Sequence, residues 1–159
     1  MRTIDAIDEQ ILKIIQTDAR IPNVDIARKI GFAPSAISER LRKLVRKGII
    51  ERFEARLNAD ALGLGLLAFV FVRTSETAGA SVAAPKLAEI PEVQEVFNVA
   101  GEDCYLVKVR ARNTDALGKL LRDRIGSIET VQSTRTTIVL ETFKETTSLP
   151  VSPTEASTS

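Results

Sequence analysis

The stretch "GFAPSAISERLRKLVRKGII" (residues 31–50) combines the charged composition of an exposed helix with the apolar spacing of a core helix. At about 100° per residue its apolar side chains form a single stripe. That stripe consists of Ile37, Leu41, Leu44 and Val45. Serine, arginine, lysine and glutamate side chains occupy the opposite side. The pattern predicts a helix, from Pro34 to about Lys47, that packs on one side and presents hydrogen-bonding and positively charged groups on the other.

Two shorter amphipathic segments come before this helix. Residues 4–18 carry isoleucines at helical spacing and acidic residues in the first turn. After a proline break, residues 23–30 form a second predicted helix, which Gly31 is suited to end. Three helices with a tight turn between the last two predict a helix-turn-helix unit spanning Asn23 to Arg42.

The basic charge of the chain is concentrated in this unit. Residues 28–56 hold 9 Lys and Arg against 3 Asp and Glu, although the whole chain has a net charge of only +1. A basic helix of this kind fits the major groove of double-stranded DNA, where Arg can bond guanine and neighbouring cations neutralise phosphates. The residues predicted to contact DNA are Ser35, Ser38, Glu39, Arg40, Arg42, Lys43, Arg46, Lys47 and Arg52, with Arg56 as a further phosphate contact.

A basic amphipathic helix taken alone could equally be a solvated surface helix. Its place as the second helix of a helix-turn-helix, with a basic segment after it, favours DNA. Glu39 does not fit simple phosphate binding. It could accept a hydrogen bond from a cytosine amino group, or hold a neighbouring arginine in place.

The rest of the chain changes from helical to alternating periodicity. Residues 49–58 alternate apolar and charged side chains, which predicts a strand or β-ribbon wing. Beyond residue 65 the predicted order is strand, helix, strand, strand, helix, strand, the βαββαβ ferredoxin-like unit. The fold class is therefore α+β, and its predicted parts are a winged helix-turn-helix domain over 1–57, a linker over 58–65, a ferredoxin-like domain over 66–144 and a disordered Ser-, Thr- and Pro-rich tail over 145–159.

The first strand of the second domain is apolar on both faces. The two helices of a βαββαβ unit cover only one face of the sheet. The other face must meet an apolar partner, most simply the same sheet of a second subunit, although the linker or the tail could also cover it. Phe69 and Val70 point to opposite faces, and the sequence leaves open which of them meets the partner.

Composition argues against several functional classes. The chain has no histidine and a single cysteine, Cys104. The usual general base, the Ser-His and Cys-His nucleophile pairs and any cysteine-cluster metal site are therefore missing. No apolar run approaches the ~18 residues of a membrane span, and the first residues do not resemble a signal peptide. We expect a cytoplasmic protein that is not an enzyme and has no catalytic residues, metal, cofactor or membrane contact. The alternative is a metabolic enzyme subunit or sensor whose helical unit docks protein rather than DNA.

Three motifs, in order, resemble those of the Lrp/AsnC regulators, also called feast/famine proteins. Residues 5–20 fit D-x-x-D-x-x-I-L followed by Q-x-D-x-R, and residues 35–49 fit the Ser-, Arg- and Leu-containing motif of the recognition helix. Residues 101–106, "GEDCYL", are similar to G-D/E-x-D-Y-L, with the acid and the cysteine shifted. Ala33 departs from the family, which usually has a capping serine there, and its absence predicts a loss of ~1 kcal/mol in helix-end stability.

The resemblance implies a sequence-specific transcriptional regulator that responds to an amino acid or related small molecule. It also implies regulatory domains that form homodimers sheet to sheet, dimers that assemble further into octamers or discs, and an effector bound between dimers. The implied effector-binding residues are Gly101, Glu102, Asp103, Tyr105, Thr134 and Thr136. The alternative for residues 101–103 is an ordinary polar turn, because Gly and Asp are common turn residues.

Overall fold

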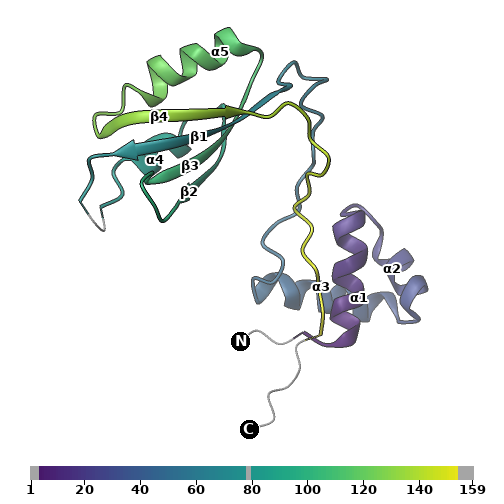
Figure 1. Ribbon diagram of the computed structural model, residues 1–159. Helices are drawn as coiled ribbons and strands as arrows, with labels where there is room; N and C mark the ends of the chain where they lie inside the picture. The colour runs from purple at the N-terminus through teal and green to yellow at the C-terminus, as the bar shows by residue number, and fades with distance from the viewer. Residues whose placement is uncertain (1–3, 78–79, 154–159) are drawn as a thin grey trace. The chain divides into compact units, whose positions relative to one another are not determined.

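The structure is a computed structural model that describes residues 4–77 and 80–153, and its chain forms two compact units (Figure 1). The N-terminal unit consists of Met1–Arg56 together with Glu145–Ser159, and the C-terminal unit of Leu57–Lys144. The chain therefore crosses between the units twice. No helix in the described ranges is long and apolar enough to cross a membrane.

The N-terminal unit contains the three predicted helices, which are α1 (Ala6–Thr17), α2 (Asn23–Ile30) and α3 (Pro34–Arg46). Their apolar stripes meet in one core, whose fully buried side chains include Ile11, Ile26, Ile37 and Leu44. Isoleucine and leucine at helical spacing therefore act as the sequence predicts, and the helix-turn-helix is confirmed. Val45, the last member of the predicted stripe of α3, does not join the core and is 45% exposed.

Local residues define where these helices begin and end. Asp5 caps α1 by accepting hydrogen bonds from the backbone N–H groups of Ile7 and Asp8. Gly31 ends α2 in the left-handed conformation, with φ of 75°. Ala33 supplies no side-chain cap to α3, as expected, and Pro34 occupies the first turn.

The predicted wing strand is absent from this structure. Residues 51–58 form no strand, although their side chains alternate in the expected way. A strand is stabilised by hydrogen bonds to a neighbouring strand, and no described segment forms a ladder with these residues. Alternation alone therefore gave the wrong secondary structure for this segment.

The C-terminal unit has the predicted βαββαβ order. Its elements are β1 (Leu66–Thr74), α4 (Ala83–Ala88), β2 (Val93–Asn98), β3 (Tyr105–Ala111), α5 (Thr114–Lys119) with its π-helical continuation η1 (Leu120–Ile125), and β4 (Val131–Ile138). The sheet is antiparallel in the order β2-β3-β1-β4. The sequence of residues 129–143 predicts a longer final strand than the observed β4.

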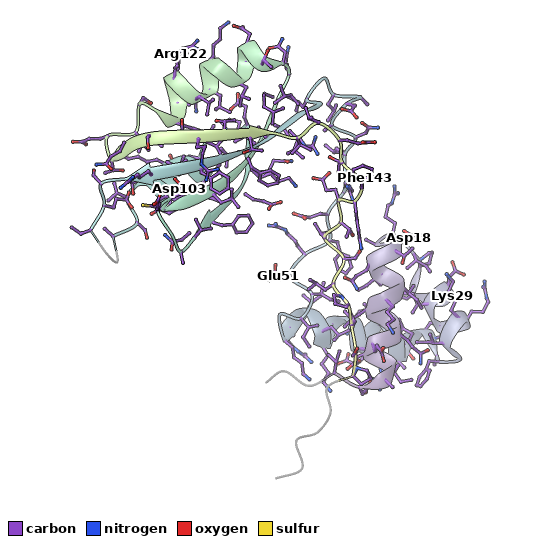
Figure 2. All side chains as sticks on the ribbon, viewed as in Figure 1. Asp18, Lys29, Glu51, Asp103, Arg122 and Phe143 are labelled. Atoms are coloured by element: carbon purple, nitrogen blue, oxygen red, sulfur yellow. The ribbon has the colours of Figure 1, made fainter. Side chains whose placement is uncertain are left out.

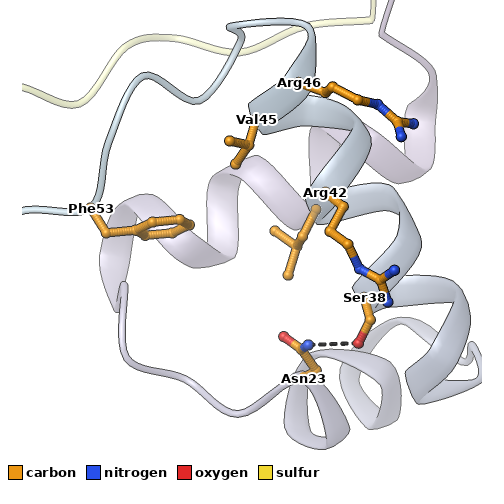
Figure 3. Close-up of a pocket in the computed structure, with 7 residues that line it drawn as sticks. Asn23, Ser38, Arg42, Val45, Arg46 and Phe53 are labelled. Atoms are coloured by element: carbon orange, nitrogen blue, oxygen red, sulfur yellow. Dashed lines mark hydrogen bonds between the residues drawn. The ribbon is translucent and has the colours of Figure 1, made fainter.

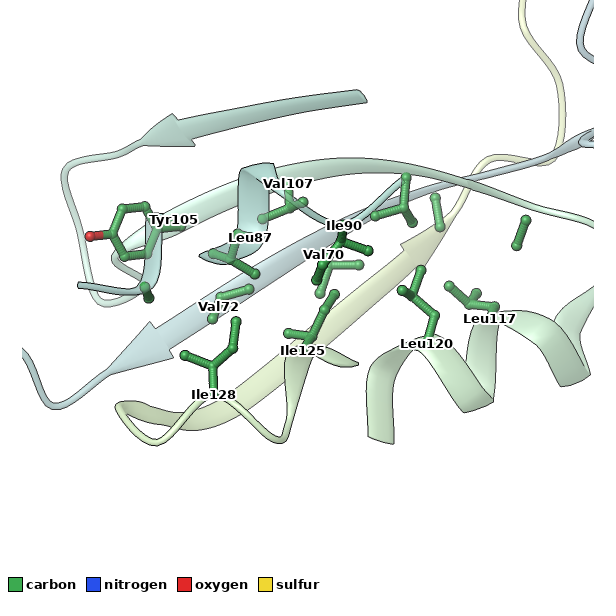
Figure 4. Packing of buried hydrophobic residues seen from close by; sticks show 14 residues of the cluster. Val70, Val72, Leu87, Ile90, Tyr105, Val107, Leu117, Leu120, Ile125 and Ile128 are labelled. Carbon is green, nitrogen blue, oxygen red and sulfur yellow. The ribbon is translucent and has the colours of Figure 1, made fainter. Parts of the chain in front are cut away.

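The helices cover one face of this sheet and leave the other open (Figure 4). Val70 and Val72 of β1 are fully buried with Leu87 of α4 and Ile125 of η1. The side chains that alternate with them point to the opposite face, where pairing brings Phe71 beside Leu106. The structure thereby decides which face lacks an internal partner. The open face carries Phe69, Phe71, Phe97 and Leu106.

Residues 145–153 differ from the disordered tail that the sequence predicts. These residues belong to the N-terminal unit, and the side chains of Gln16 and Arg56 form hydrogen bonds to their backbone. The segment has little apolar content, and its contacts to this unit are a few hydrogen bonds and the packing of Val151. Residues 154–159 lie outside the described part of the chain.

Candidate DNA-binding surface and ligand loop

The outer side of α3 presents two arginines held by one glutamate. Glu39 lies 3.5 Å from Arg42 and 3.8 Å from Arg46, measured between carboxylate oxygen and guanidinium nitrogen. The two arginine side chains are 71% and 72% exposed. Exposed ion pairs of this length contribute little free energy, so the arginines can exchange Glu39 for another partner. Glu39 thus lies near both arginines, as one of the two roles that the sequence left open for it requires.

Ser38 has a positioning role within the same surface. Asn23, the first residue of α2, donates a hydrogen bond from Nδ2 to the Ser38 hydroxyl at 2.8 Å (Figure 3). This bond links the first residue of α2 to α3. A pocket open to solvent lies beside this bond and is lined by Asn23, Ser38, Leu41, Arg42, Val45, Arg46 and Phe53.

Arg40, which the sequence predicts to contact DNA, forms ion pairs inside the N-terminal unit. One guanidinium nitrogen lies 2.7 Å from a carboxylate oxygen of Asp5 and 2.7 Å from one of Asp8. The hydrogen bond to Asp5, and then that to Asp8, raises the pKa of Arg40. Partial burial acts to raise the pKa of Asp5. The hydrogen bonds from the Asp8 backbone N–H and the Arg40 guanidinium outweigh this effect and lower the pKa below the usual 3.8. Arg40 therefore links α3 to the start of α1 through two ion pairs.

We expect Arg40→Ala to lower the free energy of unfolding by about 1–3 kcal/mol, because two charge-assisted hydrogen bonds are lost. A carboxylate whose pKa is lowered by folding stabilises the fold above its unfolded pKa, and this contribution disappears as the pH falls through the folded pKa. Wild type should therefore lose more stability than Arg40→Ala below about pH 4. Urea unfolding at pH 7 and pH 3 measures both effects. Equal pH dependence in the two proteins would contradict this role.

The other basic side chains that the sequence predicts to contact DNA differ in their exposure and in their partners within the chain. Lys43 is exposed on α3, whereas Lys47 is half-buried just after the helix. Arg52 is exposed and forms an ion pair with Glu54. Arg56, expected to contact a phosphate, instead bonds to the backbone and side chain of Glu145. Ser35 is exposed in the first turn of α3, as a DNA contact would require.

The residues predicted to bind the effector lie in two separate parts of the C-terminal unit. Asp103, at the end of the sheet where β3 begins (Figure 2), accepts a hydrogen bond from Arg135 of β4 at 3.0 Å. The Arg135 guanidinium also lies 4.0 Å from the centroid of the Phe71 ring. Gly101 has φ of 135°, which favours glycine, and Glu102 is exposed. These residues form a charged turn beside the open sheet face.

The other predicted effector residues lie on the helix-covered side of the sheet. Thr134 and Thr136 pair with Val72 and Val70, whose side chains are in the core. Tyr105 is 2% exposed. Because Arg135 lies between the two threonines in β4, its side chain points to the opposite face. The structure therefore groups Asp103 with Arg135, which the sequence did not single out, and not with the threonines.

Glu76, a carboxylate for which the sequence gives no signal, links three segments of this unit. Glu76 accepts hydrogen bonds from the hydroxyls of Tyr105 at 2.8 Å and Thr130 at 3.1 Å, and from the backbone N–H of Ala83. Burial acts to raise the pKa of Glu76, but the hydrogen bond from Tyr105 helps to lower it below its usual value. Burial, followed by that same bond, raises the pKa of Tyr105. Glu76 gave no signal because its hydroxyl partners are 29 and 54 residues away.

Both units match known protein families. Residues 4–51 match the model of a winged helix-turn-helix DNA-binding domain, and residues 67–149 match that of the Lrp/AsnC ligand binding domain. The chain is 43% identical over 148 residues to the HTH-type transcriptional regulator FL11 of Pyrococcus horikoshii, covering 93% of this chain and 97% of that protein. It is 35% identical over 155 residues to the leucine-responsive regulatory protein of Escherichia coli, covering 94% and 93%.

Solved structures of transcriptional regulators are similar to this chain over nearly its whole length. Escherichia coli AsnC superposes with a TM-score of 0.87 at 30% identity, covering 94% of this chain and 100% of that one. A transcriptional regulator of Neisseria meningitidis in complex with L-methionine has a TM-score of 0.86 at 32% identity, covering 93% and 97%.

Proposed function

The chain belongs to the Lrp/AsnC family of transcriptional regulators, and on that premise we propose that α3 reads an operator while an amino acid bound near Asp103 controls the outcome. The protein is a DNA-binding regulator and not an enzyme. Binding to chromosomal DNA would place it in the cytoplasm of a prokaryotic cell.

The exposed arginine pair of α3 carries the DNA part of this proposal. Arg42 and Arg46 lie one helical turn apart on the side away from the core, and Glu39 holds both only loosely. Entry into a major groove would replace these weak ion pairs by bonds to guanine and to phosphate. The positive charge of the unit supplies the part of the affinity that does not depend on sequence.

Titration of the protein with random duplex DNA at two salt concentrations tests this function. The affinity should fall steeply as salt rises, because each neutralised phosphate releases condensed counterions. Absence of binding at low salt would contradict the proposal and favour a protein-docking helical unit.

The Asp103–Arg135 pair supports an amino acid as the effector. A free amino acid carries an ammonium and a carboxylate group close together, and this pair offers one charge to each. Arg135 is 64% exposed and Asp103 25% exposed, so both can be reached by a small molecule. The methionine complex of the Neisseria meningitidis relative supports the same ligand class.

We expect Asp103→Ala to abolish thermal stabilisation by the effector while leaving DNA affinity without effector unchanged. At a ligand concentration about 100 times Kd, wild type should gain about 2.7 kcal/mol of stability. A thermal-shift screen of the twenty amino acids identifies the effector. Asp115→Ala, which removes a 74% exposed carboxylate from α5, serves as the matched control. Equal stabilisation of wild type and Asp103→Ala by a hit would place the effector elsewhere.

We also propose that the open sheet face pairs with the same face of a second copy. Phe97 remains 47% exposed on this face, and Phe69, Phe71 and Leu106 are only half-buried. Contiguous aromatic and aliphatic side chains left open in this way are typical of an interface. A homodimer would bury them, and assembly of dimers into octamers would follow the family pattern.

A further inference from the structure

The C-terminal segment, residues 145–153, is bound to the N-terminal unit although the strand before it belongs to the other unit. The division falls between Lys144 and Glu145. Arg56 holds the beginning of the segment, with a guanidinium nitrogen 3.2 Å from the Glu145 carboxylate and a second bond to its carbonyl oxygen. Val151, near the end of the segment, is half-buried and packs against the helical core.

Between these two contacts, the side chain of Gln16 binds the backbone of a single residue. The Leu149 N–H donates to Gln16 Oε1 at 2.7 Å, and Gln16 Nε2 donates to the Leu149 carbonyl at 3.2 Å. In an extended residue the N–H and C=O point to the same side, so one primary amide can meet both. Gln16 thus takes the place of a neighbouring β-strand. This is the main-chain mode of peptide recognition.

The sequence of the segment favours this arrangement. Leu149 precedes Pro150, and a residue before proline is restricted to extended conformations. Less conformational entropy is therefore lost when Gln16 binds it. The Leu149 side chain is 72% exposed, so α1 recognises the backbone and not the leucine.

We propose that Gln16 is a backbone-recognition site whose ligand is this chain's own Leu149-Pro150 segment, and that the bound segment is a second connection between the ligand-binding and DNA-binding units. The first connection is the linker before β1. The second runs from β4 through residues 139–149 to α1, and the bonds of Asp5 and Asp8 to Arg40 continue it to α3. This inference rests on the proposed function for its effect on DNA.

Hydrogen exchange tests the site without DNA. The Leu149 amide should exchange on the order of ten times faster in Gln16→Ala than in wild type. Gln16→Glu keeps the acceptor oxygen for the Leu149 N–H but cannot donate to the Leu149 carbonyl, so it should lose less protection than Gln16→Ala. Gln10→Ala changes an exposed glutamine on the same helix and should match wild type. Unchanged protection of Leu149 in Gln16→Ala would overturn the proposal.

DNA titration tests the second connection. Gln16→Ala and Leu149→Pro, which removes the N–H from the segment side, should each weaken DNA binding by roughly three- to tenfold, because a less restrained unit loses more freedom on binding. The variant with both changes should bind DNA no more weakly than either single variant, because each of the three proteins lacks the same connection. Wild-type affinity in the single variants, with Leu149 unprotected in Gln16→Ala, would show that the segment does not restrain the DNA-binding unit. A wild type that binds no DNA would instead contradict the proposed function, and the exchange result would decide the site by itself.

Discussion

Replacement of Phe69 by aspartate should yield folded, soluble protein with the mass of a single chain, whereas replacement of its neighbour Val70 should prevent the C-terminal unit from folding. Phe69 lies on the open sheet face, which we propose to be the dimer interface, and a carboxylate there would be buried without a partner only in the assembly. Val70 is completely buried between the sheet and the helices, so a carboxylate there is unpaired within the folded chain itself.

Light scattering and circular dichroism distinguish the two outcomes. Arg122→Asp is the matched control, because Arg122 is exposed on the helical layer outside the sheet (Figure 2) and should tolerate a charge reversal. The sheet-pairing proposal fails if Phe69→Asp folds and keeps the mass of the wild-type assembly. It also fails if wild type is itself a single chain in solution.

Replacement of Arg42 by alanine should cost about 1–3 kcal/mol of binding free energy on a duplex selected from a random library. The physical reason is the loss of a bidentate bond to a base edge, so random duplexes should lose much less and base preference should relax at one position. Fluorescence anisotropy titrations with selected and random duplexes measure the difference between these losses.

Lys43→Ala is the matched control on the same helix. Its loss should be similar on selected and random DNA, and its salt dependence should be weaker by about one phosphate. Folded Arg42→Ala protein that binds the selected duplex as tightly as wild type would remove Arg42 from the recognition surface.

Local sequence determined the helices of the N-terminal unit and the order of elements in the C-terminal unit. The apolar stripe of α3 and the cap at Asp5 act over three or four residues, so they can be read along the chain. The same local reading failed for the wing, because a strand depends on a partner that the alternating pattern does not specify.

The roles of individual polar residues depended on neighbours far away in sequence. The sequence placed Arg40 and Ser38 on the DNA-binding side, but Arg40 meets acids 32 and 35 residues earlier and Ser38 meets an amide 15 residues earlier. Arg135 was missed because only strand pairing brings it near Asp103.

What the sequence by itself determined, then, is which residues share a face: the periods of helix and strand settled the basic side of α3 and the two alternating faces of β1. Only the tertiary structure decided which face of β1 the helices cover, which arginine fastens α3 to α1, and that a glutamine of α1 binds a backbone 133 residues later. The physical reason is that periodicity fixes the direction of a side chain relative to its own element, whereas its partner is fixed by the packing of segments that the local pattern does not relate.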